Sequence, residues 1–256
     1  MIQRLFAPIS RPEAPPPWGL AAAFSGLIAA FAAILIGSTL ALMFYCGAPE
    51  NAAYCQALNF RLPPAVSLAA WTLGAALTIA FVFATRRKPA ERAALRLGSM
   101  RLSVFWVLLV SVGLAVTLDV ITLRITSPLV AEPELQSFKA LPAGPLDWAL
   151  ALVFMVIAQP AAEELVFRGL LLPALRQAAG PWPGYLLSAV LYAVFHLLAY
   201  PPAAQDLNGL WYGALLPLVG GLVFGALRLH TGSTRAAILG HAAFGLFAVL
   251  KLAALG

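Results

Sequence analysis

Two adjacent carboxylates and one guanidinium stand close together in an otherwise apolar stretch, at residues 159–169. In a helix, residues four apart lie on one face, so Glu164 and Arg168 are spaced to form an ion pair. Glu163 is turned about 100° from Glu164 around the helix axis and has no basic residue within one turn. Burying an ionisable group in a membrane helix costs roughly 2.5–3.5 kcal/mol. Because pairing explains only Glu164 and Arg168, we interpret Glu163 as a candidate catalytic group.

Two of the three histidines, His196 and His241, also lie in uncharged stretches, whereas His230 stands in a turn typical of a solvated loop. Either ring alone would usually be explained by a hydrogen bond to a helix carbonyl group. Together with Glu163, the two rings predict a shared site. A carboxylate beside an imidazole can deprotonate water, and a second imidazole can donate to a developing oxyanion. The same three side chains can instead bind zinc with one open position, and the sequence leaves both chemistries open.

Motifs of several other enzyme classes are absent from the chain. It has no Gly-x-Ser-x-Gly elbow, no His-Glu-x-x-His pair, no phosphate-binding glycine loop and no Cys-x-x-Cys. Ser188 lies two helical turns before His196, so a serine nucleophile there has no base within reach. Nucleophilic serine catalysis is therefore disfavoured.

The elements that carry these residues are predicted to be membrane-spanning helices. The chain of 256 residues is 62% hydrophobic and 10% charged, with a mean hydropathy of +0.89, whereas soluble domains carry about 25% charged residues. A crossing helix needs about 20 apolar residues, so we expect an all-α polytopic bundle of about seven helices, within a range of about six to eight. The formal charge of +6 is spread between apolar runs and does not indicate a nucleic-acid partner. The expected spans are residues 18–45, 64–84, 102–123, a long segment from 147 to the Pro/Gly break at 180–184, 185–200, 210–227 and 236–255.

Basic residues predict the orientation of this bundle. Residues 86–101 hold six basic residues and one acidic residue, and short basic loops stay in the cytoplasm. The N-terminal tail (1–17) is then cytoplasmic, followed by three spans (18–145) and a core of about four helices (146–256). We expect an integral protein of a bacterial inner membrane. The same basic loop either binds anionic lipid headgroups or only sets the topology.

Narrower expectations concern the two loops predicted outside, at 46–61 and 124–145. Cys46 and Cys55 fall in or beside the first, where an intraloop disulfide and two unpaired thiols fit the sequence equally well. Asp119 stands five residues before Arg124, so an ion pair between these two at the membrane interface is the favoured interpretation.

The spacing of these polar residues resembles the CPBP family, the CAAX-protease and bacteriocin-processing intramembrane endopeptidases, also called the Abi family. The resemblance covers about residues 146–251. It implies an all-helical fold with a polar cavity inside the bilayer that opens toward the cytoplasm. It also implies a water activated by one acid and one histidine, a second histidine as oxyanion donor, and supporting residues around them. The matching motifs are Glu163-Glu164-x-x-x-Arg168, Tyr192-x-x-x-His196, Phe224-Gly225, Thr231-Gly232-Ser233 and His241. The resemblance implies that Glu163 and His196 activate the water and that His241 is the oxyanion donor. It implies supporting roles for Glu164, Arg168 and Tyr192.

The sequence departs from the family pattern at two positions. Tyr192 replaces a usual Phe and adds a hydroxyl group. Gly245 stands where the last motif usually has Asn, so the second oxyanion donor is missing, and losing such a donor typically costs about 10²–10³ in rate. Family members are described as glutamate-type endopeptidases with a debated metal requirement. Their eukaryotic relatives remove the last three residues of prenylated CAAX proteins.

These observations together predict an intramembrane endopeptidase that acts on a membrane-associated, CAAX-like or lipidated, protein or peptide. We expect no cofactor, and the alternative is a zinc ion bound by Glu163, His196 and His241. A non-catalytic membrane scaffold or bacteriocin-immunity-type protein is the second hypothesis, and Gly245 is the residue that favours it. A proton-relaying transporter is the third, because acid and histidine side chains can pass protons. That hypothesis is weaker, since such residues do not line several successive spans.

Overall fold

The computed structural model describes residues 2–57, 62–125, 135, 138, 143–200 and 207–255. Much of the predicted loop 124–145, the end of loop 46–61 and the turn after Tyr200 lie outside these residues. Within them, seven helical segments are long and apolar enough to cross a membrane, which confirms the predicted number. The protein is therefore an all-α polytopic membrane protein. The seven spans are Leu20–Cys46, Pro64–Thr85, Val104–Arg124, Pro145–Ala179, Pro181–Ala199, Leu207–Thr231 and Thr234–Ala254.

The helices fall into an N-terminal and a C-terminal set. The first set is α1 (Ile2–Ser10), α2 (Leu20–Cys46), α3 (Pro49–Ala57), α4 (Pro64–Thr85), α5 (Pro89–Ala94) and α6 (Val104–Ile125). The second set is α8 (Pro145–Leu152), η2 (Val153–Ala158), α9 (Gln159–Glu164), η3 (Leu165–Leu171), α10 (Leu172–Ala179), α11 (Pro181–Ala199), α12 (Leu207–Leu210), η4 (Trp211–Leu215), α13 (Leu216–Thr231) and α14 (Thr234–Leu255), where η marks a π-helix.

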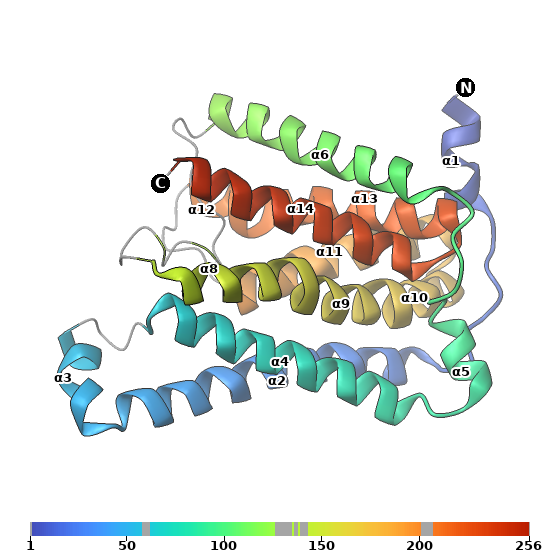
Figure 1. The fold of residues 1–256 in the computed structure, drawn as a ribbon. Helices are drawn as coiled ribbons and strands as arrows, with labels where there is room; N and C mark the ends of the chain where they lie inside the picture. Colours follow the sequence, from blue (N-terminus) through green and yellow to red (C-terminus); the bar gives the residue numbers. More distant parts are fainter. Residues whose placement is uncertain are drawn as a thin grey trace.

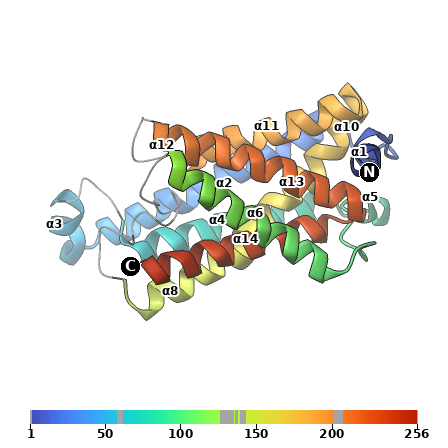
Figure 2. The ribbon, with the colours of Figure 1, turned by 90° about the horizontal axis from the view of Figure 1, so that it is seen from above.

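The longest span, Pro145–Ala179, is also the most buried of the seven and passes through the middle of the bundle (Figure 1). The α2–α4 pair packs against one side of this central span, and α14 and α11 pack against it from the other direction. Helix α6 lies on the outside of the bundle, alongside α14 (Figures 1 and 2). Residues on the central span therefore face protein on most sides.

Each of the three π-helices ends two residues before a proline: η2 before Pro160, η3 before Pro173 and η4 before Pro217. Proline has no N–H to donate, and its ring clashes with the carbonyl group four residues earlier. Widening the preceding turn to a π-type turn relieves this clash while the helix continues. The prolines thus explain why the spans that carry the candidate site are irregularly wound.

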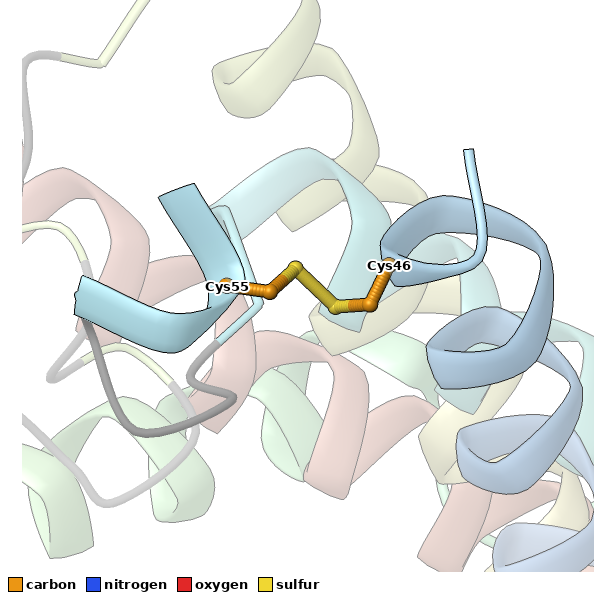
Figure 3. The surroundings of a disulfide bond; sticks show 2 residues. All are labelled: Cys46 and Cys55. Carbon is orange, nitrogen blue, oxygen red and sulfur yellow. A yellow bond between two sulfur atoms is a disulfide. The ribbon is translucent and has the colours of Figure 1, made fainter. Parts of the chain in front are cut away.

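The two ends of the bundle differ in character (Figures 1 and 2). Helices α1 and α5 lie at one end, which we call the basic end because the basic connection 86–101 runs there. Helix α3 lies at the other end, where Cys46 and Cys55 form a disulfide (Figure 3). The sequence had left that disulfide and two unpaired thiols open.

Two sequence expectations are corrected. The segment expected to be an N-terminal tail (1–17) contains a folded helix, α1, which packs against α13 and α11. Asp119 pairs with Lys251 of the adjacent helix α14, with Oδ1 and Nζ 3.0 Å apart, and not with Arg124. Sequence proximity favoured the local partner, but the packing of α6 against α14 offers Asp119 a cation from a different helix.

Candidate active site

Helices α9 and α11 bring the unpaired acid and the first histidine together inside the bundle. Glu163 and His196 are both buried. Their nearest side-chain atoms, Glu163 Oε2 and His196 Nε2, are 3.5 Å apart. The Tyr200 hydroxyl group lies 3.5 Å from the other carboxylate oxygen, Oε1. Glu163 therefore faces polar groups of α11 and not the lipid.

The hydrogen bonds of His196 fix which of its nitrogens faces Glu163. His196 Nδ1 is 3.2 Å from the carbonyl oxygen of Tyr192. A carbonyl oxygen only accepts, so Nδ1 is the protonated donor, and Nε2 of the neutral ring is an acceptor. Two acceptors, Nε2 and Glu163 Oε2, then face each other. Such a pair either shares one proton or is bridged by a water that donates to both, which is the arrangement of a general base.

The second histidine is held by the other carboxylate. His241 Nδ1 lies 3.1 Å from Glu164 Oε1, and the ring stacks on Phe224 with centroids 5.0 Å apart and planes 15° apart. A carboxylate that binds Nδ1 fixes the orientation of an imidazole and leaves Nε2 for other partners. Glu164 is thus the positioning partner of His241, a contact that the sequence did not predict.

Arg168 compensates the charge of Glu164 in an environment without solvent. Both side chains are fully buried, and Arg168 Nη1 lies 3.0 Å from Glu164 Oε1, as the four-residue spacing predicted. Arg168 Nη2 donates to the Gly221 carbonyl oxygen at 2.8 Å, and its guanidinium covers the Tyr192 ring at 4.4 Å. A buried ion pair is stable only when additional hydrogen bonds satisfy it. Arg168 therefore ties α13 and α11 to the acidic helix.

Two further neighbours of Glu163 each stand one helical turn from a residue of the Glu163–His196 pair. Gln159 stands four residues before Glu163 and interacts with its carboxylate, as Tyr192 does. Tyr200 stands four residues after His196. Neither Gln159 nor Tyr200 was singled out from the sequence, although the four-residue spacing was a signal that could have found both.

A cavity of about 50 Å³ adjoins the two histidines. One water needs roughly 10–15 Å³ of such space, so the cavity has room for a few. The lining continues from His241 through Met155 to Tyr200 and Tyr212, near the ends of helices that lie away from the basic end. The resemblance implies a cavity that opens toward the cytoplasm, and the positive charges predict that the basic end is the cytoplasmic one. The cavity extends in the other direction.

A second, smaller cavity lies beside Glu163 itself. Its volume is about 10 Å³, which is close to the space that one water needs. Residues of the N-terminal helices form one wall of it, among them Ile34 of α2 and Trp71 of α4, while Gln159 and Tyr200 belong to the linings of both cavities. The first two spans therefore help to enclose the acid.

Gly245, which replaces the family Asn, allows α14 to approach η2 very closely. A Cβ atom built on Gly245 would lie 2.9 Å from the carbonyl carbon of Met155 and would overlap its carbonyl oxygen. No side chain fits at this position without moving a helix. The asparagine side chain that the resemblance leads us to expect at this position is thus excluded by backbone packing.

The three side chains considered as zinc ligands, Glu163, His196 and His241, are not grouped around one position. Among the described residues, no three His, Cys, Asp or Glu side chains are grouped so that they could hold one metal ion. His241 contacts Glu164, while His196 contacts Glu163. The two carboxylate–imidazole pairs are suited to proton transfer.

Comparison with known proteins adds one finding to this geometry. No curated protein and no solved structure matches the chain. Residues 145–247, which contain both carboxylate–imidazole pairs, match the family model described as type II CAAX prenyl endopeptidase Rce1-like. This match supports the resemblance of the C-terminal helices to CAAX-type intramembrane proteases.

Proposed function

We propose that the protein is an intramembrane endopeptidase in which Glu163 and His196 activate a water for attack on a peptide bond. The observation that carries this proposal is the 3.5 Å approach of Glu163 Oε2 and His196 Nε2, two groups that both accept protons, inside membrane-spanning helices. Such a pair can take a proton from water as the water oxygen attacks the carbonyl carbon.

In the first step, one O–H bond of water breaks and its proton passes to the Glu163–His196 pair. The new C–O bond converts the peptide carbonyl group into a tetrahedral oxyanion. His241 donates to this oxygen from Nε2, and in this role the ring carries protons on both nitrogens and forms an ion pair with Glu164. In the second step, the C–N bond breaks and the stored proton moves to the leaving amine. The products are a carboxyl group and an amine.

The substrate class follows from the family and the membrane setting. We propose a membrane-associated protein or peptide with a CAAX-like or lipidated end. The cavity beside the histidines is lined mainly by apolar and aromatic side chains, including Leu216, Phe224 and Phe244, which suits an apolar substrate segment. We further propose that the basic connection faces the cytoplasm of a bacterial inner membrane.

The test is cleavage of a peptide ending in a prenylated CAAX sequence by the full chain in liposomes, followed by mass spectrometry. Glu163→Gln and His196→Ala should each lower the rate by about 10²–10⁴, and His241→Ala by about 10²–10³. His230→Ala is the matched control, because His230 lies outside the cluster and bonds the Ala226 carbonyl group. Cleavage by all three site variants at the unmodified rate would refute the proposal.

One observation favours a second candidate, a non-catalytic scaffold that binds other membrane proteins. Gly245 leaves the family's second oxyanion donor absent, and Met155 fills the space. A scaffold should keep its cellular effect in Glu163→Gln, whereas a hydrolase should lose it. Comparing the termini of membrane proteins in cells with and without the chain separates the two candidates without a known substrate.

A further inference from the structure

A second cluster of charges lies at the basic end, away from the candidate active site. Three guanidinium groups surround one carboxylate, that of Glu13 in the segment after α1. Arg96 Nε is 3.1 Å from Glu13 Oε1, Arg176 Nε is 3.8 Å from Oε2, and Arg228 Nη1 contacts Oε1. One carboxylate neutralises one of three cations. The cluster therefore carries an excess of two positive charges.

Arg228 is the least satisfied of these cations. Its side chain is 1% exposed, yet Nε and Nη2 have no hydrogen-bond partner among the described residues. Nε and Nη2 form one edge of the guanidinium fork, and parallel donors of this kind match two oxygens of a phosphate or carboxylate group. Leaving such donors buried without a partner is costly. The edge is therefore suited to an anion that the chain itself does not supply.

Arg228 also belongs to the lining of a cavity of about 410 Å³. Glu13, Arg96 and Arg228 belong to its lining, together with Ser99 and the Pro15–Pro16 stretch of the N-terminal segment. The space accommodates a phosphate group with further atoms attached. Arg176 does not line it and instead holds the N-terminal segment in place, because its nitrogens donate to the carbonyl groups of Ile9, Arg11 and Pro181.

The backbone around Arg96 shows that this cavity is a built feature. Arg96 has a φ of 54°, in the left-handed region that residues other than glycine rarely adopt. Such a conformation persists only where the surroundings fix it. Here the Arg96 carbonyl oxygen accepts hydrogen bonds from Thr234 N at 2.8 Å and Ser233 Oγ at 3.1 Å. The α13–α14 turn thus holds Arg96 in the position from which its side chain reaches Glu13.

We propose that this pocket binds a phosphate-bearing anion, with the Nε and Nη2 edge of Arg228 as its main donor. A phosphate group suits the two excess positive charges better than a single carboxylate. The headgroup of an anionic phospholipid presents this group at a membrane surface, where basic residues are attracted to it. Free inorganic phosphate presents the same chemistry from solution. The proposal does not depend on proteolytic activity.

The experiment measures binding of two probes to the full chain in a neutral detergent. Phosphatidylglycerol, with phosphatidylcholine as the neutral reference, is followed by native mass spectrometry, and inorganic phosphate is followed by its effect on the melting temperature. We expect Arg228→Gln to weaken binding by about tenfold or more. Arg87→Gln is the matched control, because Arg87 is exposed, bonds the Ala84 carbonyl group and does not line the cavity. Binding of phosphatidylglycerol identifies a lipid source, and binding of inorganic phosphate alone identifies a soluble one.

A second variant keeps the test decisive if Arg228→Gln fails to fold. Glu13→Gln removes the carboxylate that competes for the same cations, so anion binding should tighten, and the anion should raise the melting temperature of this variant more than that of the unmodified chain. The proposal is overturned if neither probe binds, if Arg228→Gln and Arg87→Gln weaken binding equally, or if Glu13→Gln weakens binding.

Discussion

The close approach of α14 to η2 at Gly245 makes a quantitative prediction. In Gly245→Ala, the added Cβ atom would lie 2.9 Å from the Met155 carbonyl carbon, whereas carbon atoms in ordinary contact are about 3.5–4.0 Å apart. The two helices must therefore separate by about 1 Å, or the backbone of η2 must shift. Inserting an atom into a well-packed interior typically costs about 1–3 kcal/mol. Higher helix propensity of Ala over Gly returns about 0.5–1 kcal/mol. The expected net loss is therefore up to about 2.5 kcal/mol, and about 1 kcal/mol at the midpoints of the two ranges.

The assay is thermal unfolding of the purified chain in one detergent, followed by tryptophan fluorescence. A loss of about 1 kcal/mol corresponds to a decrease of roughly 2–4 °C in melting temperature for a chain of this length. Gly113→Ala is the matched control, because Gly113 lies on the exposed face of α6 and an added Cβ there meets nothing within 4 Å. Gly113→Ala should leave the melting temperature unchanged or raise it.

The same reasoning extends to Gly245→Asn, which would supply the amide group that the family carries at this position. Because Met155 already occupies the space, we expect Asn to destabilise the chain more than Ala does and not to raise the rate of cleavage. A Gly245→Ala variant as stable as Gly113→Ala would refute the packing argument. A Gly245→Asn variant that is both stable and more active would refute it as well.

Three further predictions concern the rest of the molecule. Arg168→Ala should destabilise the chain by about 3–5 kcal/mol, because Glu164 is then buried without its cation; a melting temperature equal to that of the unmodified chain would contradict this. Reduction of the Cys46–Cys55 disulfide, which closes a loop with a sequence separation of 9, should lower stability by up to about 2–3 kcal/mol, and the reductant should have no effect on a chain with both cysteines replaced by serine. A cysteine placed at Arg92 in a chain without the disulfide should react with a membrane-impermeant thiol reagent only after the cytoplasmic side is opened, and labelling of intact cells would reverse the proposed orientation.

Part of the fold and of the site could be predicted from the sequence because it depends on local spacing. Apolar length predicted seven spans, and the four-residue separation of Glu164 and Arg168 predicted their ion pair. The same spacing rule, applied to Gln159 and Tyr200, would have added both residues to the site.

Contacts between helices could not be obtained this way. The sequence does not show that the packing of α14 places His241 next to Glu164. It also does not show that Asp119 pairs with Lys251 and not with Arg124. The docking of α1 on α13 and α11 was missed for the same reason, since the composition of the first residues says nothing about which surface they contact.

Ile34 of α2 and Trp71 of α4 line the small cavity beside Glu163. The family match starts at residue 145, yet part of the shell around the acid is contributed by helices that precede it. A chain cut down to residues 146–256 would lose this wall and shield Glu163 less from hydrocarbon, where burying an ionised carboxylate costs free energy. The segment that matches the family is therefore shorter than the set of helices that encloses Glu163, because α2 and α4 precede the match.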